Sequence, residues 1–249
     1  MDSTIRTADG CELASYFTRP PGTTAVPGLV LCHGFPSGPR GSAASGLTYP
    51  ELADRLARDA GWAVLTFNFR GTGASAGDFS IGGWLADQRA AVNQLAARED
   101  VSGVWLVGSS LGGALGVQTA ADDQRVRGLA TLAAPAVLRR WAREPARFLE
   151  HARSLGVFRT PGFPPTPAAW AREIAEVDTV GAARAIPPRP LLVLHGSEDG
   201  QVPVEEAREI AEAADGSAEL RIVYAAGHGL RHDPRAIAAL LGWLDRQYH

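Results

Sequence analysis

The sequence predicts an α/β fold in which helices flank both faces of a mostly parallel central sheet. Short apolar runs of β type alternate along the chain with longer segments of helical periodicity, a rhythm typical of parallel sheets. The 249 residues, 45% of them hydrophobic and 20% charged, suffice for one large domain with a substantial core. Length alone would also allow two small domains, so the alternating pattern decides the prediction.

Seven segments have the composition of strands. Most are continuous aliphatic runs, as strands buried on both faces require, whereas 62–69 and 220–224 alternate apolar with small or polar residues. The first segment is expected to be an antiparallel strand at one edge of the sheet. In chain order, the predicted strands are 11–17, 26–32, 62–69, 104–107, 126–133, 191–194 and 220–224.

Five segments between or after these predicted strands have helical periodicity. In the first, Leu52 and Leu56 lie one turn apart, and Gly61 ends the helix. The last begins with Pro234, which fits the first position of a helix because its missing amide hydrogen is not needed there. The predicted helices are 49–60, 84–97, 111–121, 204–214 and 234–248.

Residues 136–189 interrupt this alternation and are too long for a simple connection. They contain helix-like stretches at 137–155 and 167–177, separated by the proline-rich segment 161–167, whose interior cannot be helical. We interpret the segment as a helical insertion. The predicted organisation is a core formed by 1–135 and 190–249, with 136–189 as a cap.

All 24 basic residues are arginine. The absence of lysine excludes a Schiff-base lysine, a P-loop lysine and a Ser-Lys dyad. A formal net charge of -3 gives no general reason to expect nucleic acid or an anionic membrane surface as a partner.

The two cysteines, Cys11 and Cys32, have no metal-ligand spacing, and we expect no metal site. Residues 1–10 are polar and lack the apolar region of a signal peptide, and no apolar stretch approaches the length of a membrane span. We therefore expect a cytoplasmic protein without membrane contact. The sequence leaves the oligomeric state open, a homodimer included.

The strongest local pattern is Gly108-Ser109-Ser110-Leu111-Gly112, which follows a predicted strand and begins a predicted helix. A Gly-x-Ser-x-Gly sequence in this context forms a tight turn that exposes the central serine as a nucleophile. The flanking glycines avoid collisions between side chains and nearby backbone. The spacing selects Ser110 over its neighbour Ser109.

A serine hydroxyl needs a base to become a nucleophile, and the base needs an acid to orient it. His228 follows the last predicted strand and is the best base, with His232 as the second choice. Asp199 follows the strand at 191–194 and is the predicted acid, with its neighbour Glu198 as a competitor. The order Ser110, Asp199, His228 matches nucleophile, acid and base in sheets of this type.

The turn His33-Gly34-Phe35 follows the strand at 26–32 on the same predicted edge. Glycine at this place lets backbone approach a substrate closely. We predict an oxyanion hole formed by the backbone amides of Phe35 and Leu111, and a structural role for His33 in bracing the turn.

These residues resemble the α/β-hydrolase superfamily over nearly the whole chain. Within it, the chain is similar to small bacterial carboxylesterases, feruloyl-esterase-like enzymes and serine aminopeptidase-like hydrolases. The resemblance implies hydrolysis of a small-molecule acyl ester without a cofactor, through an acyl-enzyme. The matching features are His33-Gly34-Phe35, the loop 69–75 with a structural Arg70, the turn at Ser110, Asp199 with Val202-Pro203, and Gly227-His228.

The predicted cap supplies four aromatic candidates for an apolar substrate pocket: Trp141, Phe148, Phe163 and Trp170. The alternative is that they pack the cap onto the main domain. The surplus of arginine over glutamate in the same segment would suit an anionic substrate such as a coenzyme A thioester, or a solvated helix face.

A carboxylic-ester hydrolase is the leading functional hypothesis. The same three residues would also serve a peptidase or amidase, or a thioesterase or acyltransferase. A ligand-binding protein that retains the fold without catalysis is the remaining alternative.

Overall fold

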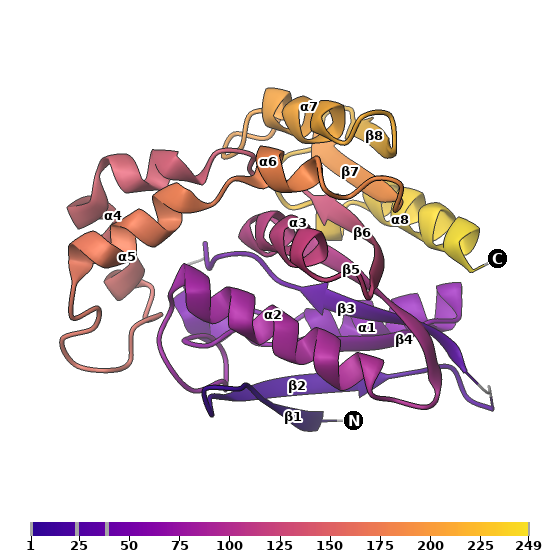
Figure 1. Cartoon of the computed structure of the whole chain (residues 1–249), viewed down its shortest axis with the longest axis horizontal. Helices are drawn as coiled ribbons and strands as arrows, with labels where there is room; N and C mark the ends of the chain where they lie inside the picture. Colours follow the sequence, from indigo (N-terminus) through magenta and orange to yellow (C-terminus); the bar gives the residue numbers. More distant parts are fainter. Residues whose placement is uncertain (1, 23–24, 38–39, 249) are drawn as a thin grey trace.

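A computed structural model describes residues 2–22, 25–37 and 40–248, except for the side chains of residues 141 and 142. Its strands are β1 (Asp2–Arg6), β2 (Glu12–Thr18), β3 (Val26–Cys32), β4 (Ala63–Phe67), β5 (Val101–Ser109), β6 (Val126–Leu132), β7 (Leu191–Gly196) and β8 (Ala218–Val223). They form a sheet of order β1-β2-β4-β3-β5-β6-β7-β8 (Figure 1). The β1–β2 and β2–β4 pairs are antiparallel and the other five pairs are parallel, so the predicted mostly parallel sheet is confirmed.

The antiparallel edge differs from the prediction in one respect. The strand expected at 11–17 is β2, but β1 pairs along its outer side from Asp2 to Arg6, so β2 is the second strand rather than the edge. Only Ile5 of β1 is buried. A single buried side chain gives almost no alternating pattern, and the sequence therefore did not reveal β1.

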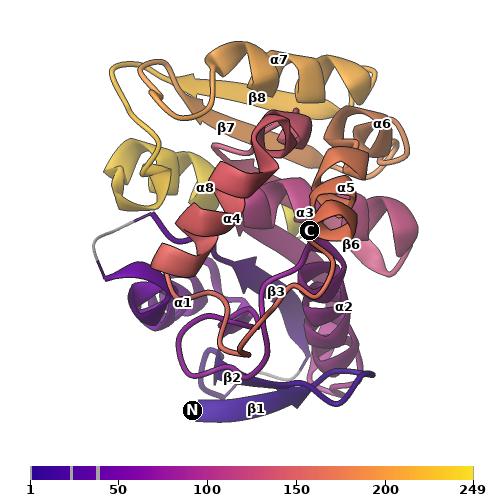
Figure 2. The same cartoon turned by 90° about the vertical axis from the view of Figure 1, so that its left-hand side faces the viewer.

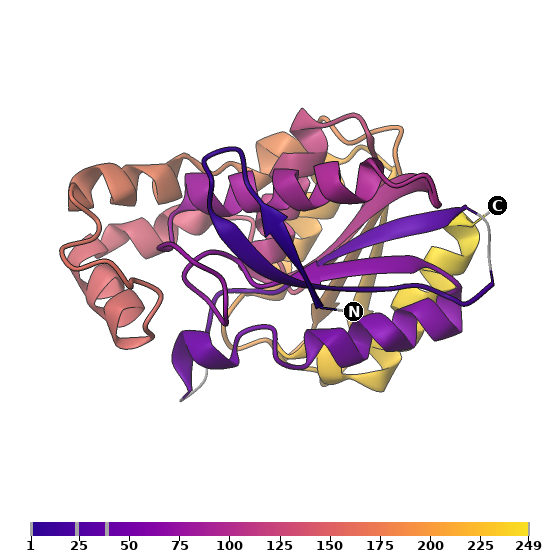
Figure 3. The ribbon, with the colours of Figure 1, turned by 90° about the horizontal axis from the view of Figure 1, so that it is seen from below.

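Helices cover both faces of the sheet, as expected. On one face lie α1 (Tyr49–Ala60) and α8 (Pro234–Gln247), and on the other α2 (Ile81–Ala96), α3 (Leu111–Asp122) and α7 (Val204–Ala213) (Figure 3). Each layer buries its own apolar cluster, one centred on Leu56, Trp62 and Trp243 and the other on Trp84 and Leu115.

The connection between β6 and β7 contains a 3₁₀ helix η2 (Leu138–Arg143), then α4 (Pro145–Ser154), α5 (Pro167–Glu176) and α6 (Thr179–Ala183). The helices α4 and α5 project beyond the end of the sheet, and Figure 2 shows them from that side. In contrast, α6 packs on α3 and α7.

The single helical stretch predicted at 137–155 is wrong in detail. The chain forms η2, leaves helical geometry at Glu144 with φ -121° and ψ 68°, and starts α4 at Pro145. Proline lacks the amide hydrogen that a continuous helix would use there, but it suits the first position of a new helix. Within the described residues, no helix is both long and apolar enough to cross a membrane.

Parallel strands bring their carboxyl ends to one edge of the sheet. The chain leaves β3 at His33, β5 at Ser110, β7 at Ser197 and β8 at Tyr224. The loops that follow these four strands therefore lie next to one another, and they hold every residue singled out for catalysis.

Candidate active site

Ser110 lies between β5 and α3 on a turn of unusual geometry. Its φ of 49° and ψ of -124° are rare for a residue with a side chain. Hydrogen bonds from both sides hold the turn: the Ser110 amide donates to the Leu132 carbonyl on β6 at 2.8 Å, and its own carbonyl accepts from the Gly113 amide at 2.9 Å. The surrounding structure therefore fixes Ser110 in a conformation that it would rarely adopt alone.

Glycine is required around this turn because backbone comes too close for a side chain. A Cβ atom on Gly112 would lie 2.2 Å from the His33 carbonyl oxygen, and one on Gly108 would lie 2.4 Å from the Gly112 carbonyl oxygen. A Cβ on Gly34 would lie 2.9 Å from Ser110 Cβ. These distances show that the loop after β3 packs directly against the turn that carries Ser110.

The predicted acid and base form a hydrogen-bonded pair. His228 Nδ1 donates to Asp199 Oδ2 at 2.8 Å, and the Asp199 side chain is fully buried. Burial opposes ionisation of Asp199, but the bonds from His228 and from the amides of Val202 and Gln201 outweigh it and hold the pKa below its usual range. The competitor Glu198 is exposed, and the hydrogen bond from His228 goes to Asp199.

A second histidine, which the sequence did not single out, supports the acid. His195 is the second-last residue of the buried strand β7, and its Nε2 donates to the Val202 carbonyl at 2.9 Å while lying 3.4 Å from Asp199 Oδ2. Since a carbonyl only accepts, Nε2 carries the proton. His195 thus fixes the loop that presents Asp199. Its place directly after the strand predicted at 191–194 was the available signal, but an aliphatic run does not indicate a hydrogen-bond partner.

His33 is fully buried and orients the turn after β3. Its Nδ1 donates to the Gly34 carbonyl at 2.7 Å, and its Nε2 accepts from the Phe69 amide at 3.1 Å. Burial lowers the pKa of His33 to about 4, so the ring is neutral at neutral pH. Because Gly34 C=O and Phe35 N–H belong to one planar peptide and point in opposite directions, fixing the carbonyl also fixes the amide of Phe35.

Ser110 and His228 line the same cavity of about 430 Å³. The rest of the wall comes from the turn after β3, the segment 40–49, the residues that follow His228, and Ser109 and Leu132 at the ends of β5 and β6. No aspartate or glutamate is among the residues that the structure places on this wall. The polar or ionisable side chains of the lining are His33, Ser37, Arg40, Ser45, Thr48, Tyr49, Ser109, Ser110, His228, Arg231 and His232.

The aromatic side chains proposed for the substrate pocket lie elsewhere. Phe148 stacks on Trp170 with 5.3 Å between ring centroids, and Phe163 lies 5.3 Å from Phe158. Trp170 is buried in the apolar cluster, with Phe148 and Phe163 packed against it, and none of the three lines the cavity. The side chain of Trp141 lies outside the described residues. This arrangement is that of the alternative interpretation, in which aromatic residues pack the insertion onto the main domain.

The comparisons with known proteins identify the family and the fold. The family model of the alpha/beta hydrolase fold matches residues 27–185, which is more than half of the chain. The chain belongs to the α/β-hydrolase family. An uncharacterised 31.7 kDa protein of Escherichia coli is 31% identical in an alignment over 128 residues that covers 46% of this chain and 40% of that protein's length.

Solved structures of similar fold cover nearly the whole hydrolase. The α/β hydrolase GrgF from Penicillium sp. sh18 has a TM-score of 0.78 at 17% identity, with 100% of this chain and 98% of that chain covered. Est1E from Butyrivibrio proteoclasticus, solved with ferulic acid, has a TM-score of 0.76 at 18% identity over 98% and 97%. An esterase domain from a Rhodothermus marinus protein has 0.71 at 23% identity over 99% and 96%. At these identities the likeness shows the fold.

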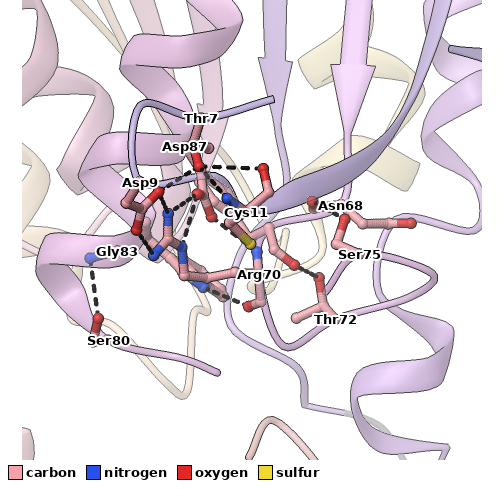
Figure 4. A network of polar contacts seen from close by, with 12 residues as sticks. Thr7, Asp9, Cys11, Asn68, Arg70, Thr72, Ser75, Ser80, Gly83 and Asp87 are labelled. Atoms are coloured by element: carbon pink, nitrogen blue, oxygen red, sulfur yellow. Dashed lines mark hydrogen bonds and ion pairs between the residues drawn. The ribbon is translucent and has the colours of Figure 1, made fainter. Parts of the chain in front are cut away.

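Arg70 of this hydrolase takes part in a network that joins the sheet edge to α2 (Figure 4). Its Nε donates to Asp87 at 2.8 Å and its Nη1 to Asp9 at 2.7 Å. Asp87 is fully buried on α2, and Asp9 lies in the turn between β1 and β2. Arg70 is absent from the cavity lining, which fits the structural role expected from the sequence.

Proposed function

We propose that this member of the family is a serine hydrolase that cleaves carboxylic esters through an acyl-enzyme. The observation that carries the proposal is the Asp199–His228 hydrogen bond at the wall of the cavity that Ser110 also lines. Three loops supply these residues in the order nucleophile, acid and base, and each follows a parallel strand.

The proton positions support the assignment of His228 as the base. An ionised Asp199 accepts the Nδ1 proton of His228, which leaves Nε2 with a free electron pair. As Ser110 Oγ attacks the acyl carbonyl, Nε2 takes its proton and later gives it to the departing alcohol. Water then attacks the acyl-enzyme, loses a proton to the same nitrogen, and releases the acid and Ser110.

The tetrahedral intermediate needs donors for its negative oxygen, and two backbone amides support this role. The amide of Leu111 is at the first position of α3, where no helical carbonyl can accept from it. The amide of Phe35 has its direction fixed through His33. Loss of one such donor costs about 100-fold or more in rate.

The lining of the cavity argues against one alternative. A peptidase that binds a free amino terminus needs a carboxylate for the ammonium group, and the described cavity wall contains none. The glutamates on or beside α4 and α5 lie outside the wall: Glu144, Glu150, Glu173 and Glu176.

The test is hydrolysis of p-nitrophenyl esters from acetate to decanoate by the wild type, Ser110→Ala and the adjacent control Ser109→Ala. We expect turnover and labelling by a fluorophosphonate probe in the wild type and in Ser109→Ala, and loss of both in Ser110→Ala. A thioester of the preferred acyl chain, assayed in parallel, separates an esterase from a thioesterase. Absence of turnover and of labelling in the folded wild type would refute the proposal and favour a binding protein.

A further inference from the structure

The candidate cavity has an unbalanced charge. Arg40 and Arg231 both line it, and the described lining contains no carboxylate that would neutralise them. The third cationic candidate is His232, but burial lowers its pKa and the nearby Arg231 charge lowers it further, so it is neutral at neutral pH. The described part of the wall therefore has two arginines and no carboxylate.

Arg231 is held in place without an acid. It lies in the short 3₁₀ helix that follows His228, with its guanidinium carbon 5.5 Å from the centroid of the Tyr49 ring. Its Nε–H is buried and has no hydrogen-bond partner among the described residues, where no ion pair of Arg231 occurs either. The aromatic ring thus fixes the position of the cation but leaves its charge uncompensated.

Two other arginines of this chain have hydrogen-bond partners that compensate the charge of the guanidinium group. Arg235, one turn further along, binds both carboxylate oxygens of Asp233. Arg189 is also partly buried, and its Nη1 donates to the carbonyls of Ala120 at 2.7 Å and Val126 at 2.9 Å. A buried polar group without such partners is uncommon in folded proteins. Arg231 lines the cavity and has no carboxylate partner among the described residues, so the anionic group of a ligand can compensate its charge there.

The positive charge of Arg231 affects the pKa of two other side chains of the cavity wall, His33 and Tyr49. Burial is the main cause of the low pKa of His33, and the Arg231 charge lowers it further; both residues line the cavity. Burial raises the pKa of the Tyr49 hydroxyl, and Arg231 opposes that rise. An anion bound beside Arg231 would therefore lie within the same cavity as Ser110 and His228.

We propose that the natural substrate is a carboxylic ester that also has an anionic group, a carboxylate or a phosphate, and that Arg231 binds this group. The inference rests on the proposed function, because it assumes that Ser110 and His228 cleave an ester in this cavity. A volume of about 430 Å³ accommodates a small molecule that holds both groups. The reaction remains hydrolysis: water splits the ester into an acid and an alcohol, and the anionic group is unchanged.

The test compares anionic esters with neutral esters of similar size. Monoethyl glutarate against ethyl hexanoate places the charge on the acyl side, and p-acetoxybenzoate against p-isopropylphenyl acetate places it on the alcohol side. p-Acetoxyphenyl phosphate, against the same p-isopropylphenyl acetate, tests a phosphate. For each pair, kcat/KM is measured for the wild type, Arg231→Gln, Arg231→Lys and the control Arg208→Gln, which removes an exposed charge from α7 outside the cavity. Dividing the anionic by the neutral value within one variant, and comparing variants, cancels the intrinsic reactivity of each ester.

For at least one pair, we expect the ratio to fall about 10- to 100-fold in Arg231→Gln, as loss of a charge-assisted hydrogen bond predicts. Arg231→Lys should keep most of the ratio, and Arg208→Gln all of it. If every ratio is the same in the wild type and in Arg231→Gln, the inference is wrong, whereas Ser110-dependent cleavage of the neutral esters would still uphold the proposed function. If neither type of ester is cleaved and the fluorophosphonate probe fails to label Ser110, the proposed function fails and the inference fails with it. Should Arg231→Gln not fold, the loss of preference in Arg231→Met decides in its place.

Discussion

Exchange of Asp199 for asparagine is the sharpest test of the candidate acid, because the structure determines how the new amide would orient. Asp199 Oδ1 accepts from the amides of Gln201 at 2.8 Å and Val202 at 2.9 Å, and Oδ2 accepts from His228. In Asp199→Asn, the single carbonyl oxygen can serve only one of these two sides. With the oxygen toward the two amides, the NH₂ group faces His228 and donates to Nδ1. The proton of His228 must then move to Nε2, where it blocks removal of the Ser110 proton.

The expected loss of kcat follows from the free-energy cost of the alternative orientation of the side-chain amide in Asp199→Asn. Turning the oxygen toward His228 leaves two backbone donors facing an NH₂ group, and each buried unsatisfied donor costs about 1–3 kcal/mol. Gln201 is exposed, so water can bond to its amide, and the total cost is about 2–4 kcal/mol. The contact between His195 and Oδ2 is 3.4 Å, too long to offset this difference. At 1.4 kcal/mol for each factor of ten, the productive form is about 30- to 700-fold rarer, and kcat should fall by that factor.

The assay is steady-state hydrolysis of p-nitrophenyl butyrate, together with the rate of labelling by the fluorophosphonate probe. Glu198→Gln is the matched control, since it makes the same chemical exchange at the adjacent, exposed carboxylate. We expect both rates to drop in Asp199→Asn and to stay close to the wild type in Glu198→Gln. A folded Asp199→Asn enzyme that retains most of its kcat, with a large loss in Glu198→Gln, would refute the reasoning and assign the acid to Glu198.

Three further outcomes follow from the packing and from the buried charges. Gly112→Ala should lower the free energy of unfolding and abolish probe labelling, because its Cβ would lie 2.2 Å from the His33 carbonyl oxygen. The control is Gly116→Ala in the same helix, whose Cβ would have open space around it. In a urea titration this control should be neutral or stabilising by up to about 1 kcal/mol. Asp87→Asn removes the buried carboxylate that pairs with Arg70, which keeps its bonds to Asp9, and should cost about 1–3 kcal/mol; a thermal melt would show a Tm lower by roughly 2–12 °C, and an unchanged Tm would contradict the role of the network. Burial lowers the pKa of His33 from 6.5 to about 4, so His33 binds a proton more readily in the unfolded chain than in the folded one. Its contribution of about 3 kcal/mol to the free energy of unfolding is therefore present above pH 6.5 and is lost as the pH falls to 4. Urea titrations across this pH range should show a smaller loss of stability in His33→Gln than in the wild type.

The sheet and the candidate triad could be predicted because their signals are local. Continuous aliphatic runs identify the central strands, and Gly108 and Gly112 mark a turn that only glycine allows. Since parallel strands end at one edge, the residues after β5, β7 and β8 had to lie near one another, and the bond between Asp199 and His228 follows.

The walls of the cavity could not be predicted in this way. The segment 40–49 has no periodicity that would indicate which side chains face Ser110. Arg231 became a candidate for binding an anion only because the structure shows no acidic side chain beside it among the described residues, which the sequence could not reveal. His195 was hidden for a similar reason, because its partner is a backbone carbonyl that any residue at position 202 would supply. The break before Pro145 was visible in the sequence, but the helical pattern on both sides of it favoured one continuous helix.

Phe35 belongs to two parts of the molecule at once. Its backbone amide is a proposed donor to the oxyanion, while its ring lies 4.9 Å from Phe79 in the core and 5.5 Å from Phe148 on α4, measured between centroids. A displacement of α4 would therefore change the packing of the residue that we propose as a donor to the oxyanion. The proposed role of Phe35 would link catalytic rate to the position of α4, so that variation in α4 could change turnover without altering any residue that contacts the reacting bond.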